Sequence, residues 1–149
     1  MAQDSSVTAI AHVIQLAVAP VFLLTGVGAL LGVLTNRLAR IIDRARVLEE
    51  RLAVLGESER AASEADLRTL SRRARQINRA ISLSVTCALL VCAVIAALFA
   101  GAFLRADTSG LIGIVFIAAM LALIGALISF LGEIYIATRS LRIGQGHRG

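Results

Sequence analysis

The sequence predicts an all-α, polytopic membrane protein with three transmembrane helices and a cytoplasmic antiparallel coiled-coil hairpin between the first and the second. Of its 149 residues, 58% are hydrophobic. Three runs of 32, 25 and 25 residues contain no Asp, Glu, Lys or Arg, at positions 5–36, 80–104 and 108–132. A helix that crosses the hydrocarbon region needs about 20 apolar residues, which each run supplies. We therefore expect one membrane domain over 1–149, with spans at about 12–36, 81–104 and 110–132.

The distribution of arginine predicts how these spans are oriented. All 15 basic residues are arginine, and eleven of them lie between positions 37 and 79. The stretch before residue 37 has none, and the short turn at 105–109 has only Arg105. Because cytoplasmic loops carry the excess of basic residues, the N-terminus is expected outside and the C-terminus inside. The segment at about 37–79 and the tail at about 133–149 are then cytoplasmic.

The charged segment between the first two spans has the apolar spacing of a coiled coil. Apolar residues recur at alternating steps of four and three on both sides of Gly56, which predicts two helical arms joined by a short turn. Two such arms form the antiparallel hairpin over about 37–79. The first seam consists of Leu34, Leu38, Ile41, Ala45, Leu48, Leu52 and Leu55, and the second of Leu67, Leu70, Ala74, Ile77 and Ile81.

Small residues on the spans indicate close contacts between helices. The third span has a small stripe, and Gly28 and Gly32 form a GxxxG on the first. Small side chains let membrane helices approach closely, either within one chain or between copies, and we expect a homo-oligomer. The stripe on the third span is Ala118, Ala122, Gly125, Ser129 and Gly132.

One face of the N-terminal helix has the composition of a pore lining. It changes from polar at the outer end, through small and aromatic residues, to a column of arginines at the inner end, as an ion pathway with a hydrophobic constriction requires. The alternative is that the arginines set the topology and contact lipid phosphates. The candidate pore-lining residues are His12, Gln15, Ala19, Phe22, Gly26, Val33, Arg37, Arg40 and Arg44.

A second column of arginines lies on the second arm, at Arg68, Arg72, Arg75 and Arg79. Like charges at this spacing repel one another, so the column predicts an anionic counterpart. Anionic lipid headgroups, acidic residues of the hairpin and permeating anions are the candidates. Nucleic acid is not expected, because no aromatic residues accompany the arginines.

Three segments of the chain resemble a family of bacterial membrane proteins catalogued as domain of unknown function 2721. They begin at His12, Leu34 and Arg73, with the sequences HVIQLAVAPVFLLTG, LTNRLARIIDR and RARQINRAI. The resemblance covers about 10–143 and implies a protein of the bacterial inner membrane with three spans. It implies no activity or ligand.

Three polar residues are expected at the cytoplasmic membrane boundary. Asn36 and Asn78 each precede an arginine, so their amides could pair with guanidinium groups of the neighbouring helix. Glu133 lies at the inner end of the third span, and we expect it to pair with Arg37, Arg79 or Arg139.

No signature of catalysis is present in the sequence. It has no Ser-His-Asp set, no phosphate-binding glycine loop and no cluster of metal ligands, so we expect no enzyme, cofactor or metal. Two functions remain. The first is a homo-oligomeric ion channel lined by the N-terminal helix. The alternative is a membrane scaffold or accessory subunit whose basic hairpin docks a cytoplasmic protein or anionic lipid.

Overall fold

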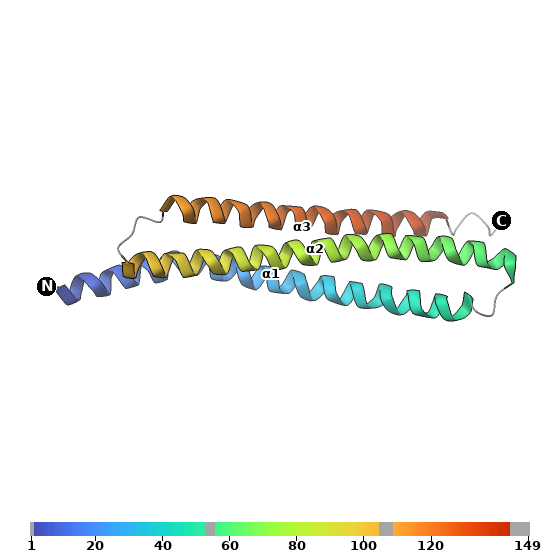
Figure 1. The fold of residues 1–149 in the computed structure, drawn as a ribbon, viewed down its shortest axis with the longest axis horizontal. Helices are drawn as coiled ribbons and strands as arrows, with labels where there is room; N and C mark the ends of the chain where they lie inside the picture. The colour runs from blue at the N-terminus through green and yellow to red at the C-terminus, as the bar shows by residue number, and fades with distance from the viewer. Residues whose placement is uncertain (1, 53–55, 105–108, 144–149) are drawn as a thin grey trace. The chain divides into compact units, whose positions relative to one another are not determined.

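The structure is a computed structural model that describes residues 2–52, 56–104 and 109–143, all but one of which lie in three α-helices (Figure 1). These are α1 (Ala2–Leu52), α2 (Glu57–Leu104) and α3 (Ser109–Ile143). Each contains a stretch that is long and apolar enough to cross a membrane, at Ile10–Leu52, Ser63–Phe103 and Ser109–Thr138. The all-helical class with three potential spans is thereby confirmed. Leu55 of the predicted seam, Arg105 and the tail at 144–149 lie outside the described residues.

All three helices are longer than the spans that they contain, and α1 and α2 each carry an arginine-rich part. α1 passes from its apolar part into its arginine-rich part without interruption, and α2 does the same in the opposite direction. Gly56 separates them. The backbone N–H of Arg60 donates to the Gly56 carbonyl at 3.2 Å, so Gly56 stands at the N-cap of α2.

The chain forms two compact units, and every helix contributes to both. The first unit, Met1–Leu31 with Leu83–Ile124, is called the membrane unit below. The second, Gly32–Ser82 with Gly125–Gly149, is called the arginine unit. Each has its own buried residues.

The membrane unit is centred on small and medium-sized side chains from all three helices. Val27 of α1, Cys87 and Val91 of α2 and Ala119 of α3 form one buried cluster. Water is absent from the lipid interior, so such a cluster holds helices together by close packing rather than by removal of apolar surface from water.

The arginine unit is built on positions that recur every seven residues. Leu34 and Ile41 of α1 are buried, and so are Leu70 and Ile77 of α2. The predicted seam residues therefore lie on the packed sides of both arms, while the supercoil of a coiled coil stays a prediction. The half-buried members of the seams are Leu38, Ala45, Leu48, Leu52, Leu67, Ala74 and Ile81.

α3 differs from expectation in its length and in its packed face. It continues through the predicted tail to Ile143. Its buried residues are Ala119, Ala126 and Glu133, again seven apart. Of the predicted small stripe, Ala118 is exposed, and the half-buried members are Ala122, Gly125, Ser129 and Gly132. The stripe therefore borders the packed face of α3 and does not form its centre.

Three of the glycines predicted to allow close helix contacts, Gly28, Gly32 and Gly132, do not do so within one chain. A Cβ atom added at Gly28, Gly32 or Gly132 would meet no atom within 4 Å. The GxxxG of α1 therefore faces open space in a single copy of the chain.

Candidate functional site

The arginine unit contains a fully buried carboxylate on α3. Glu133 has 0% exposure and takes the position that follows Ala126 in the seven-residue spacing. A buried carboxylate is costly unless cations and hydrogen-bond donors surround it. The two cations come from the other two helices.

Arg73 of α2 and Arg37 of α1 contact different oxygens of Glu133. Arg73 donates two hydrogen bonds to Oε1, from Nε at 3.0 Å and from Nη2 at 2.8 Å. Arg37 places Nη1 3.5 Å from Oε2, an ion pair without a hydrogen bond, and Oε2 has no hydrogen-bond partner. The Arg37 guanidinium also lies over the ring of Phe130, 5.3 Å from its centroid. Arg73 is thus held more firmly than Arg37.

Both arginines keep contact with solvent. The side chains of Arg37 and Arg73 are 29% and 20% exposed. They line a groove of about 440 Å³ together with Arg40, Arg44 and the apolar residues Val33, Ile41 and Leu70. We call it the arginine groove. Its lining contains four guanidinium groups and no carboxylate, and the Glu133 carboxylate behind it pairs with two of them.

A second groove, of about 560 Å³, lies on the α3 side of the same arginines. It shares Arg37, Arg44 and Arg73 with the arginine groove and adds Asp66 of α2 and Thr138 of α3. The hydroxyl of Thr138 donates to the Ile134 carbonyl at 3.2 Å, within its own helix. This second groove is less positive because Asp66 contributes a carboxylate.

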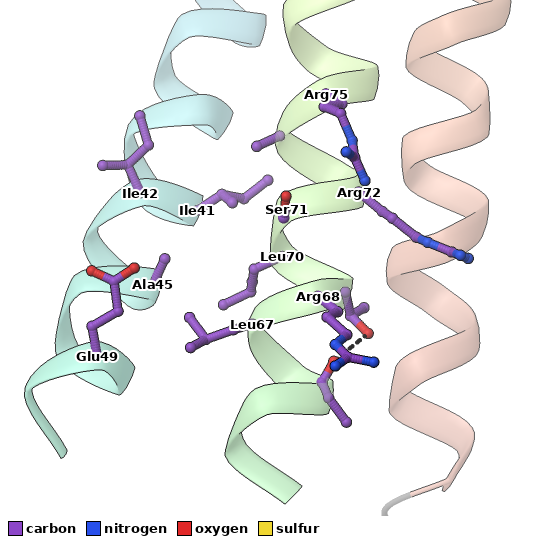
Figure 2. Close-up of a pocket in the computed structure, with 13 residues that line it drawn as sticks. Ile41, Ile42, Ala45, Glu49, Leu67, Arg68, Leu70, Ser71, Arg72 and Arg75 are labelled. Atoms are coloured by element: carbon purple, nitrogen blue, oxygen red, sulfur yellow. Dashed lines mark hydrogen bonds between the residues drawn. The ribbon is translucent and has the colours of Figure 1, made fainter. Parts of the chain in front are cut away.

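A third groove, of about 800 Å³, lies beside α1 and α2 (Figure 2). Figure 2 shows Ile41 and Ala45 of α1 pointing toward Leu67 and Leu70 of α2. The side chains of Arg68, Arg72 and Arg75 extend from the other side of α2. These three arginines and Arg79 are exposed, and the predicted second column is therefore a feature separate from the arginine groove.

The residues predicted to line a pore are mostly on the surface of the single chain. His12, Gln15, Ala19 and Gly26 are exposed, and Phe22 is 74% exposed. At the C-terminal end of the same stripe the structure gathers Val33, Arg37, Arg40 and Arg44 in the arginine groove.

At the predicted membrane boundary, one of the three residues lies at a contact between helices. Glu133 pairs with Arg37, as predicted, while Arg79 is exposed and the side chain of Arg139 lies outside the described part of the chain. Asn36 and Asn78 are both exposed. The backbone carbonyl of Asn36 accepts a hydrogen bond of 3.5 Å from Nε of Arg40.

Arg73 is the member of the Glu133 cluster that the sequence did not predict. It lies three residues after Leu70 and four before Ile77, which places it beside the seam of α2. The same spacing places Arg37 between Leu34 and Ile41 on α1. A buried cluster is therefore indicated by two features of the sequence. One is an arginine beside the seam on each of two helices, and the other is a glutamate in the seven-residue series of the third.

The fold and the groove define a multi-pass helical membrane protein with a basic site in its arginine unit. Within the described ranges, no three His, Cys, Asp or Glu side chains lie close enough together to hold a metal ion. The chain belongs to the DUF2721 family, described as proteins of unknown function, whose model matches residues 17–143. No curated protein and no solved structure matches the chain.

Proposed function

We propose that this protein is a non-enzymatic scaffold of the bacterial inner membrane whose arginine groove binds the phosphate of an anionic lipid headgroup. The groove supports this proposal because four arginines line it without a carboxylate among them. Guanidinium groups match phosphate oxygens in geometry and stay charged at every physiological pH. Basic residues just inside the membrane attract the negative cytoplasmic leaflet, by about 1 kcal/mol for each residue near the surface.

The position of the groove favours lipid as the source of the phosphate. Arg37 directly follows the 32-residue uncharged run that ends at Asn36, and Arg40 lies three residues later. In the orientation expected from the arginine distribution, this point lies at the inner headgroup level. The apolar side chain of Val33, which lies in the same lining one helical turn before Arg37 and is exposed, suits the glycerol and first methylenes of a lipid.

The test is lipid retention by the full-length protein in native mass spectrometry. The wild type should retain phosphatidylglycerol in preference to phosphatidylethanolamine, and the double substitution Arg40→Ala and Arg44→Ala should remove that preference. Arg46→Ala is the matched control, because Arg46 is exposed on the same helix and lines none of the three grooves. Equal retention of both lipids by the wild type would refute the proposal.

A second candidate function, a homo-oligomeric ion channel, is favoured by the exposed face of α1. The predicted pore-lining residues from His12 to Gly26 are exposed in the single chain. Gly28 and Gly32 also leave room for a neighbouring helix. Copies that ring an axis with this stripe inward would enclose a pathway constricted at Phe22.

Planar-bilayer recording of the purified protein tests the channel. It should show discrete conductance steps, with larger currents in Phe22→Ala because the constriction is wider. Val21→Ala is the control, since Val21 is an exposed apolar residue next to Phe22 and outside the predicted stripe. A monomeric mass in detergent, or a silent bilayer containing assembled protein, would exclude this function.

A further inference from the structure

Glu133 and the arginine groove share two cations. Arg37 and Arg73 line the groove and also contact the carboxylate of Glu133. A phosphate that enters the groove therefore meets guanidinium groups that already have an anionic partner. Binding of the phosphate therefore depends on which of the two arginines can leave Glu133 or contact both anions.

The contact geometry favours Arg37. Arg73 is fixed by two hydrogen bonds of 3.0 and 2.8 Å to Oε1. Arg37 is held only by an ion pair of 3.5 Å to Oε2 and by its position over Phe130. If Arg37 turns away, Glu133 keeps both of its hydrogen bonds and a full countercharge in Arg73. The buried carboxylate is then still neutralised, so the movement of Arg37 is inexpensive.

Arg37 is also placed to turn toward the groove. It is the more exposed of the two arginines, at 29%, and it follows Val33 by four residues and precedes Arg40 and Arg44 on one side of α1. Its guanidinium can therefore join those of Arg40 and Arg44 around one phosphate. A guanidinium without a hydrogen bond to its present partner gains charge-assisted hydrogen bonds from phosphate oxygens.

We propose that Glu133 is an internal competitor for the lipid phosphate, and that Arg37 exchanges between the Oε2 atom of Glu133 and the bound headgroup. This inference rests on the proposed function and deepens it, because it assigns to α3 control over the affinity of a groove formed by α1 and α2. Glu133 is a positioning residue in this scheme, since it acts on the lipid through Arg37.

The test measures the dissociation constant of phosphatidylglycerol for full-length variants in detergent. Glu133→Gln keeps an oxygen that accepts from Arg73 but removes the charge that attracts Arg37, so the affinity should rise about three- to tenfold. Glu50→Gln is the matched control. It removes the same charge from an exposed site on α1 that lines none of the three grooves, and should leave the affinity near that of the wild type.

A double-mutant cycle separates competition for Arg37 from a general effect of charge. In an Arg37→Ala background the lipid should bind more weakly, and Glu133→Gln should then produce no gain. A gain that persists without Arg37, or an unchanged affinity in Glu133→Gln, would overturn the inference. If Glu133→Gln does not fold, Glu133→Asp keeps the charge but withdraws the carboxylate by one methylene, and a raised affinity is again the expected result.

The outcomes distinguish this inference from the function on which it rests. If Arg40→Ala and Arg44→Ala abolish the preference for phosphatidylglycerol while Glu133→Gln leaves the affinity unchanged, the groove binds lipid and the competition does not occur. If neither has an effect, the groove is not a lipid site.

Discussion

At the scale of single residues, the cluster of Glu133, Arg37 and Arg73 is the least expected feature of this chain. The sequence indicates that Glu133 pairs with an arginine, because an ionisable group at the end of a span requires a partner. It also indicates Arg37 as one candidate. The choice of Arg73 over Arg79 depends on which side of α2 meets α3. The sequence does not show which side this is. In the structure it is evident from the burial of Leu70 and Ile77 on α2 and of Ala126 and Glu133 on α3.

The unequal contacts of the two arginines predict unequal costs of removing them. Arg73→Ala leaves Glu133 buried without its two hydrogen bonds, and breaking a buried pair of this kind costs about 3–5 kcal/mol of stability. Arg37→Ala should cost clearly less, because Arg37 makes no hydrogen bond to Glu133. Thermal unfolding in detergent should rank the variants in this order.

The double substitution Arg73→Met and Glu133→Leu provides the control for this ranking. It removes both charges and replaces them with apolar groups of similar size, so much of the stability should return. A variant Arg37→Ala that is as unstable as Arg73→Ala would contradict the prediction, because it would show that the 3.5 Å ion pair stabilises the protein as much as the two hydrogen bonds.

At the scale of the helices, the charge pattern and the apolar spacing were enough to predict most of the architecture. The three uncharged runs predict the helices, and the alternating steps through Leu34 and Ile41, and through Leu70 and Ile77, predict the packed faces of both arms. The extension of α3 to Ile143 was not predicted, because a charge at Glu133 resembles the end of a span. Here the charge lies inside the protein, where Arg73 and Arg37 neutralise it.

The small residues were a weaker guide than the apolar spacing. Gly28, Gly32 and Gly132 were expected at contacts, yet a Cβ at any of them would meet nothing within 4 Å in the single chain. Small residues permit a close approach without requiring one, whereas large apolar residues at seven-residue spacing form one continuous side that packs. This difference fits the burial of Leu34, Ile41, Leu70 and Ile77 and the open surroundings of the three glycines.

At the scale of the whole molecule, the lipid-binding proposal requires one orientation in the membrane. Glu64 and Ala11 are exposed residues in the parts of the chain expected inside and outside the cell. In a background with both native cysteines replaced, Glu64→Cys should react with a membrane-impermeant maleimide only after the cells are opened. Ala11→Cys should react in intact cells. The reverse pattern would place the arginine groove on the wrong face for the cytoplasmic leaflet.

Every helix takes part in both units, and α1 has no break between Val27 of one unit and Leu34 of the other. One residue inserted between Leu34 and Arg37, inside the arginine unit, would turn the rest of α1 by about 100° and carry Arg37 away from Glu133. Because α1 is one uninterrupted helix, an insertion is felt by every contact after it, whereas a substitution alters a single position.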